Sequence, residues 1–214
     1  MSDRAFAPLR SLRPLVRRTP RSGSPLQPAT PDPSAIDKIH ARASLVDSAV
    51  YVDGDRVESP TTLADTYRAL RRNADAIAWI GLYRPDQHEL ASLGEEFGLH
   101  ELAVEDAIVA HQRPKLERYD HTLFVVLRAA QYLDDVEEVA FGEVHVFAGP
   151  DFVVTVRHSE APDLSAVRRR LESNPDLLRL GPEAILYAIL DRIVDGYLPV
   201  VAGLVTATGA DPWL

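Results

Sequence analysis

The sequence predicts an α/β/α sandwich with a mixed, largely antiparallel sheet and a long C-terminal helix that leaves it. Stretches of helical and of strand-like periodicity are interspersed along the chain, which indicates a sheet with helices packed on it. Apolar stretches at 123–131, 139–147 and 152–157 are joined by short loops, so we expect antiparallel neighbours. A further apolar run at 76–83 predicts a buried strand.

Turn and cap signals define the elements of the first half of the chain. Valines alternate around the turn signal Asp53-Gly54-Asp55, which predicts a hairpin or a pair of short strands within residues 44–57. Ser59-Pro60-Thr61-Thr62 supplies an N-cap for a following helix. Pro85 is expected to begin the next helix, where its missing N–H costs nothing, and Gly98 to close it.

The central stretch joins an acidic helix to a buried strand. Leu99–Ala110 predicts a short helix that carries Glu105 and Asp106. Gln112–Lys115 is a polar breaker, because its proline disfavours the helical region for the residue before it. Tyr119–Arg128 then predicts a strand with an apolar centre.

Three further signals organise the C-terminal part. Asp163 caps a helix that Asn174-Pro175 breaks. Gly181-Pro182 opens the last helix, and its apolar stripe consists of Ile185, Ile189 and Ile193. Pro199 is expected to bend or stop this helix.

Composition divides the chain into four parts. Residues 1–40 are rich in Pro and Arg and lack periodicity, which predicts a disordered tail, either solvated or touching anionic lipid headgroups. The α/β domain follows at 41–180 and the last helix at 181–205. Residues 206–214 have poor helix propensity and form an atypical end.

Charge and motif content exclude several classes of function. Residues 1–31 hold six arginines against one aspartate, a net +5, which leaves −14 for the rest of a chain of charge −9. Such an acidic body favours cations and disfavours nucleic acid as a partner. Cysteine is absent, and no nucleophile–base or zinc-ligand spacing is found, so we expect no enzyme. The most apolar stretch, 184–205, is interrupted by charges, so no membrane span is expected.

The carboxylates of the acidic helix are the candidate ligands. Glu101 and Glu105 are four residues apart and share a helix face, and Asp106 lies about 100° round from Glu105. Mg²⁺ binds through one or two such carboxylates while it keeps several waters. Acidic residues near a helix start are also favoured by the helix dipole alone. The residues therefore leave both a weak cation site and a solvated acidic edge open. His145 alternates with core valines and is expected to be a satisfied structural histidine.

Five motifs occur in a fixed order along the chain: Trp79–Leu82, Leu102–Ala107, Gln112–Glu117 running into Phe124–Arg128, Phe152–Arg157, and Gly181–Tyr187 running into Asp191–Tyr197. Together, over about residues 45–204, they resemble the cytoplasmic domain of the CorA family of magnesium and cobalt transport channels. In that family the last helix leads toward a stalk, which we expect to be missing here.

The resemblance implies a cytoplasmic Mg²⁺-sensing, gating domain of a divalent-cation channel, with Co²⁺ as a second ion. It implies Mg²⁺ sites between the subunits of a pentamer, which Mg²⁺ locks closed. At these sites Glu105 and Asp106 match family ligands, and either Asp191 or Asp195 matches a further one.

The same resemblance implies that parts of the family's architecture are missing. The family's membrane helices are joined by a Gly-Met-Asn signature, and Met1 is the sole methionine of this sequence. We therefore expect a truncated form without a pore, located in the cytoplasm, with membrane contact only through the missing C-terminal helices. We expect a monomer or a weak homo-oligomer. The alternative is a soluble adaptor that uses the same fold without metal sensing.

Overall fold

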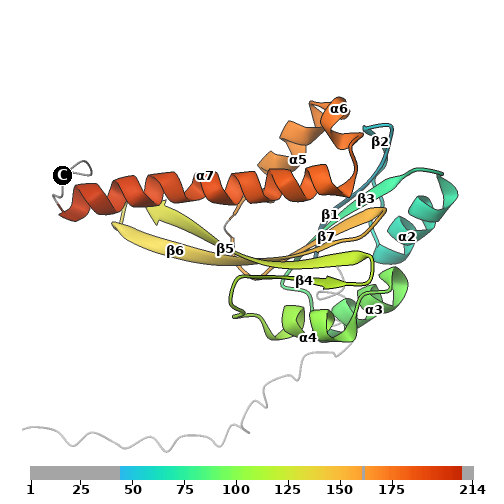
Figure 1. Ribbon diagram of the computed structural model, residues 1–214, viewed down its shortest axis with the longest axis horizontal. Helices are drawn as coiled ribbons and strands as arrows, with labels where there is room; N and C mark the ends of the chain where they lie inside the picture. Colours follow the sequence, from blue (N-terminus) through green and yellow to red (C-terminus); the bar gives the residue numbers. More distant parts are fainter. Residues whose placement is uncertain (1–43, 161, 209–214) are drawn as a thin grey trace, which may run out of the picture.

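Helices cover both faces of a seven-stranded sheet in the computed structural model, which describes residues 44–160 and 162–208 (Figure 1). The strand order is β2-β1-β3-β7-β6-β5-β4, and β3 and β7 form the one parallel pair among these strands. The elements are β1 (Leu45–Val52), β2 (Asp55–Glu58), α2 (Leu63–Arg72), β3 (Ile77–Tyr83), α3 (Gln87–Phe97), α4 (Glu101–Val109), β4 (Lys115–Tyr119), β5 (Thr122–Leu133), β6 (Glu138–Ala148), β7 (Phe152–Arg157), α5 (Leu164–Glu172), α6 (Pro175–Leu178) and α7 (Pro182–Thr208).

This architecture confirms the predicted α/β fold with a mixed, largely antiparallel sheet. The expected neighbours β5, β6 and β7 are antiparallel, and β1 and β2 form the expected hairpin. The tail predicted at residues 1–40 and the last six residues of the predicted end segment, 209–214, lie outside the described residues.

Two separate apolar cores hold the layers together. On one face α2, α3 and α4 pack on the sheet through side chains such as Leu70, Leu90 and Ala107. On the other face α5, α6 and α7 pack through residues such as Leu178 and the predicted stripe Ile185, Ile189 and Ile193. Each fully buried Leu or Ile contributes roughly 1.5–3 kcal/mol relative to exposure. The sheet therefore separates α4 from α7 (Figure 1).

Most helix ends follow the sequence signals, with one correction. Thr62 caps α2 by accepting from the Asp65 amide, and Gly98 closes α3 with a φ of 64°. Pro85 does not begin α3, because Asp86 is the N-cap and its side chain forms a capping box with Glu89. The Asp86 carboxylate accepts from the Glu89 amide and the Glu89 carboxylate accepts from the Asp86 amide, so this pair sets the start of the helix and Pro85 precedes it.

The single strand predicted over Tyr119–Arg128 is wrong at its start, because the observed strand β5 begins at Thr122. Tyr119 ends a separate edge strand, β4, and a turn with Asp120 at a φ of 49° precedes β5. β4 pairs with residues 122–126 of β5 alone. In its sequence, Lys-Leu-Glu-Arg-Tyr, the exposed Leu116 and Arg118 alternate with half-buried side chains, so it carries no apolar core run.

The last helix continues through Pro199 and is not stopped by it. A proline inside a helix costs about 3 kcal/mol or more. Contacts with β5 next to the proline offset this cost: the Tyr197 hydroxyl donates to the Arg128 carbonyl at 2.6 Å, and Gly196 lies against the Ala130 carbonyl. Val200, which follows the proline, is buried.

Two glycines with positive φ offer a matched test of the packing between β1–β2 and α6. A Cβ on Gly54 (φ 86°) would lie 2.2 Å from the Pro175 carbonyl oxygen, whereas a Cβ on Gly98 (φ 64°) would meet nothing within 4 Å. We expect Gly98→Ala to lower the free energy of unfolding by about 1–2 kcal/mol, from backbone strain alone. Gly54→Ala adds a backbone clash and should cost at least about 3 kcal/mol.

Urea unfolding followed by circular dichroism measures both costs. Equal losses for the two variants would contradict the close packing of Gly54 on α6.

Candidate functional site

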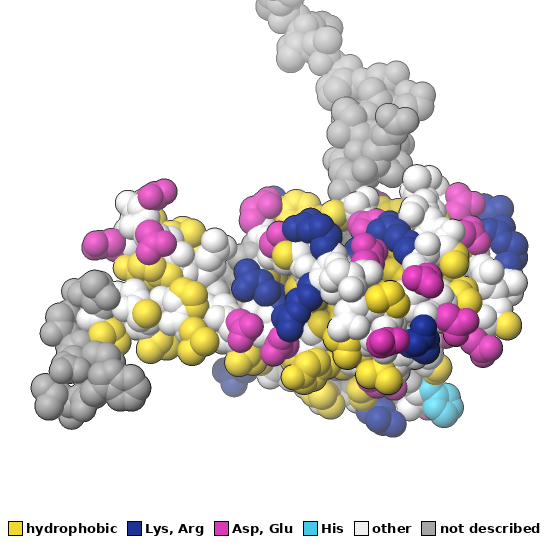
Figure 2. All heavy atoms as spheres, turned by 90° about the horizontal axis from the view of Figure 1, so that it is seen from above, with side chains coloured by type: hydrophobic (Ala, Val, Ile, Leu, Met, Phe, Trp, Pro, Cys, Tyr) yellow, Lys and Arg dark blue, Asp and Glu magenta, His cyan; other side chains and the backbone are white. Residues whose placement is uncertain are grey.

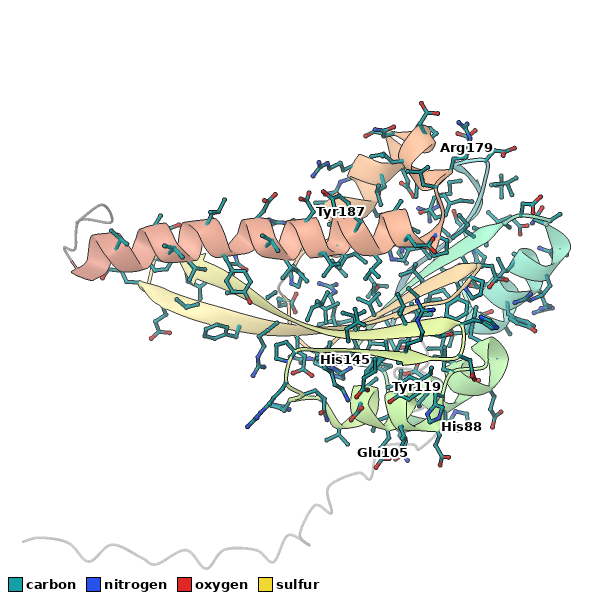
Figure 3. The ribbon with its side chains drawn as sticks, viewed as in Figure 1. His88, Glu105, Tyr119, His145, Arg179 and Tyr187 are labelled. Carbon is teal, nitrogen blue, oxygen red and sulfur yellow. The ribbon has the colours of Figure 1, made fainter. Side chains whose placement is uncertain are left out.

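The packing of the short helix α4 produces its acidic edge, which we define as Glu101, Glu105 and Asp106. Ala103 and Ala107 face the core, and this turns Glu101 and Glu105 outward to solvent. Figure 3 shows Glu105 pointing away from the sheet. Within the described ranges neither Glu101 nor Glu105 makes a side-chain ion pair. These two carboxylates are therefore available to a cation from solution.

Asp106, in contrast, is already paired. The Lys115 ammonium of β4 lies 2.7 Å from Asp106 Oδ2 and 3.0 Å from Glu117 Oε2. The Tyr119 hydroxyl also donates to Glu117, at 2.9 Å. Hydrogen bonds to Asp106 and Glu117 raise the pKa of Lys115, and the hydrogen bond from Lys115 lowers the pKa of Glu117. The ammonium therefore stays charged at neutral pH and links α4 to β4.

The N-terminal end of α4 is held by an aromatic contact. His100 caps the helix, since its Nδ1 accepts from the Leu102 amide at 3.3 Å. The His100 ring stacks on Tyr119 with 4.2 Å between ring centroids. The start of the acidic edge is thus fixed to β4, the strand that also carries Lys115.

A polar cluster holds the C-terminal end of α4, and we define this buried cluster as Glu143 and His145, which are buried, with His158, which is half-buried. His158 Nε2 lies 2.9 Å from the Ala107 carbonyl oxygen, one of the last free acceptors of the helix. The Gln112 amide donates to Glu143 Oε1 at 3.1 Å. These bonds anchor a connection in which two successive residues, Ala110 and His111, have positive φ.

His145 lies inside this cluster, on the side of the sheet that carries α4 (Figure 3). Its Nε2 donates to Glu143 Oε1 at 2.5 Å, whereas the fully buried Nδ1 has no partner among the described residues. The predicted structural histidine is therefore half satisfied. Burial lowers the pKa of His145, although the hydrogen bond to Glu143 opposes this shift. The imidazole is neutral in the folded protein near pH 7.

Sequence reasoning missed Glu143 and His158 as residues that position the site. A signal for Glu143 exists, because it occupies an inward position of the alternating strand that also holds Phe147 and His145. An acidic residue at such a position requires buried partners. His158, by contrast, follows the strand β7 and carries no pattern that points to α4.

Asp191 and Asp195 are both on α7, on the face of the sheet opposite α4 (Figure 1). Asp191 forms an ion pair with Arg170 of α5 at 3.3 Å. Asp195 is exposed and has no ion-pair partner in the described part of the chain. The structure thus leaves Glu105 and Asp106 as neighbours on α4, with Glu105 facing solvent and Asp106 facing Lys115 of β4. It places Asp191 and Asp195 on the opposite face of the sheet. In residues 44–160 and 162–208 no three His, Asp or Glu side chains are grouped to hold a metal ion.

Comparison with known proteins decides the family. The family described as "CorA-like Mg2+ transporter protein" matches residues 74–209, more than half of the chain. The chain belongs to this family. The resemblance seen in the five sequence motifs is thereby confirmed. Among the helices of the described residues, none has the length and apolarity that crossing a membrane requires.

Relatives of this CorA-like chain are named as metal transporters. It is 42% identical over 123 residues to YfjQ of Bacillus subtilis, which is named as a metal ion transporter, and 29% identical over 130 residues to the cobalt/magnesium transport protein CorA of Thermotoga maritima. These matches cover 58% and 59% of this chain. The chain spans 37% and 36% of the length of these two relatives.

Solved structures show the same fold. The soluble domain of CorA from Methanocaldococcus jannaschii aligns with a TM-score of 0.54 at 16% identity, covering 75% of this chain and 61% of that chain. The ZntB cytoplasmic domain from Vibrio parahaemolyticus aligns with a TM-score of 0.52 at 14% identity, covering 77% and 65%. The CorA-like sheet with its two helical layers is therefore shared with both domains.

The buried cluster predicts a pH dependence of stability. Because folding lowers the pKa of His145, only the unfolded chain takes up this proton just below its ordinary pKa of about 6.5. The unfolded state then binds more protons, so stability falls as the pH drops through this window, by up to about 1.4 kcal/mol per pH unit.

Urea unfolding between pH 7.5 and 5.5 measures this slope. His145→Gln should make the slope shallower, and the exposed His88→Gln should leave it unchanged. A slope in His145→Gln that equals the wild-type slope would rule out this histidine as the source.

Proposed function

We propose that this chain is the Mg²⁺-sensing, gating domain of a CorA-like divalent-cation transporter. The observation that carries the proposal is the acidic edge of α4, where Glu105 is exposed and unpaired within the described residues, directly beside Asp106. Membership of a family described as Mg²⁺ transporters supports Mg²⁺ as the ion, with Co²⁺ as a second one. On this proposal the domain lies on the cytoplasmic side of a membrane.

The chemistry of the acidic edge suits a weakly held, hydrated ion. Mg²⁺ dehydrates reluctantly and binds through one or two carboxylates together with several waters. Glu105 and Asp106 supply two carboxylates on one short helix, and no third ligand is grouped with them in the described residues. Because such an edge binds the ion weakly, the fraction of domains that hold an ion changes with the ion concentration.

A further ligand would have to come from a second copy of the chain. Asp191 and Asp195 lie across the sheet from α4 and cannot reach an ion bound at Glu105 of the same copy (Figure 1). We infer that the ion bridges α4 of one copy and α7 of another. Mg²⁺ then favours the associated, closed state by binding it more tightly than the open one.

The exposed side of α7 supports such self-association. Figure 2 shows apolar side chains gathered along this helix. They include Tyr187, Val194, Leu198 and Val201, which are between 57% and 70% exposed. Their spacing of seven, four and three residues forms one helical stripe, the pattern by which helices pair. Asp191 falls on the same stripe, so an interface there would place this carboxylate between copies.

One observation favours a different function. Asp106 is neutralised by Lys115 within the chain, which leaves Glu105 as the free member of the pair. An adaptor that keeps the fold, binds another protein and senses no metal is therefore the second candidate. The two candidates differ in whether removing the carboxylates of α4 changes any response to Mg²⁺.

The test is a Mg²⁺ titration from an EDTA-treated sample, with Na⁺ at matched ionic strength. Thermal unfolding and sedimentation are measured together. A sensing domain gains stability specifically with Mg²⁺, by about 1.4 kcal/mol at ten times the dissociation constant. The double variant Glu105→Gln with Asp106→Asn should lose this gain.

The exposed pair Asp134 and Asp135, in the turn between β5 and β6, provides the matched control. Changing both to Asn removes the same charge and should preserve the Mg²⁺ response. Asp191→Asn with Asp195→Asn should abolish the Mg²⁺-dependent rise in mass. A wild-type response no larger than that to Na⁺ would overturn sensing and leave the adaptor function.

A further inference from the structure

Lys115 occupies the position that a cation on Asp106 would take. Its ammonium lies 2.7 Å from Asp106 Oδ2 on α4 and 3.0 Å from Glu117 Oε2 on β4. The neighbouring Phe124 ring, on β5, has its centroid 5.7 Å from the ammonium. The carboxylate of Asp106 therefore already holds a positive charge that is tethered to the same chain.

The local structure explains why Lys115 points at α4. Residues two apart on a strand share a face, so Lys115, Glu117 and Tyr119 all face the side on which α4 packs. Tyr119 stacks on His100, the N-cap of α4, and this contact fixes the distance between β4 and the helix. Arg118, which lies between Glu117 and Tyr119, is exposed and faces the side of the sheet opposite α4. Within the described ranges, Arg118 forms no ion pair.

We propose that Lys115 is a built-in competitor that a metal ion must displace from Asp106, and that it thereby sets the ion concentration at which the acidic edge responds. This inference rests on the proposed function, because it assigns a regulator to the same carboxylates. Glu117 gives the displaced ammonium a place to remain, since it already lies within 3.0 Å. The lysine thus has two partners and can exchange between them through rotation about its flexible stem.

The direction of the effect follows from charge. A dication that approaches Asp106 meets the repulsion of an ammonium within a few ångströms, and it must also break an ion pair. Removing the ammonium leaves Glu105 and Asp106 as two free, adjacent carboxylates, so the affinity for Mg²⁺ rises.

Three variants of the full chain test the inference. Lys115→Met removes the charge and keeps an apolar stem of similar length against Phe124. Lys115→Arg keeps a cation. Arg118→Met removes the same charge from the same strand but from the other face. The midpoint of a Mg²⁺ titration is read from the backbone amide resonances of Glu105 and Asp106, which report binding at the helix without reference to stability.

We expect Lys115→Met to lower the Mg²⁺ midpoint by about tenfold, a difference of about 1.4 kcal/mol. Lys115→Arg should keep or raise the wild-type midpoint. Arg118→Met should shift the midpoint by no more than about twofold, as a distant exposed charge does. In the wild type, the Nζ resonance of Lys115 should move as Mg²⁺ saturates the helix.

The outcomes separate this inference from the proposed function. Equal midpoints for Lys115→Met and Arg118→Met would overturn the competitor role while leaving sensing intact. No Mg²⁺ shift in either wild type or Lys115→Met would overturn both. A flat wild type with a Lys115→Met variant that binds Mg²⁺, and loses binding with Asp106→Asn added, would support the competitor. If Lys115→Met does not fold, Lys115→Gln replaces it.

Discussion

Burial of the central strands on both faces is the constraint on which the rest of the structure depends. β3 and β7 lie in the middle of the sheet and are almost wholly apolar, so each face requires its own layer of helices. That requirement places α4 and α7 on opposite sides. The acidic edge and the carboxylates of α7 are consequently separated by the full thickness of a sheet. An ion shared between them is an ion shared between molecules.

The helix that carries the acidic edge, α4, is short and is held by contacts at each of its ends. The helix α4 has nine residues, a length that is marginal without tertiary support. Stacking of His100 on Tyr119 fixes its start, and His158 and Glu143 hold its end. Lys115 then joins its middle to the sheet. The ion pair of Asp106 with Lys115 therefore both reduces the negative charge of the acidic edge and helps to hold the helix α4 on the sheet.

Local patterns predicted most of the fold because each apolar run has a single way to be buried. The valine-rich strand β7 and the isoleucine stripe of α7 are examples. β4 escaped prediction because an edge strand that is half exposed needs no apolar run. Of the site, helical spacing predicted an acidic edge on α4, and the resemblance to the CorA family singled out Glu105 and Asp106 as its ligands, a role that is a proposal. The pairing of Asp106 with Lys115 could not be predicted, since it depends on how a loop folds back and brings β4 beside the helix.

Because α7 is anchored along β5, the long helix moves with the sheet as one rigid unit. Its 27 residues span about 40 Å, and Tyr197 and Gly196 tie it to the sheet beyond its midpoint. A rigid rod of this length converts a rotation of about 5° in the domain into a displacement of about 3.5 Å at its end. If domains associate as proposed, a small rotation between neighbouring domains would therefore produce a displacement of a few ångströms at the end of α7.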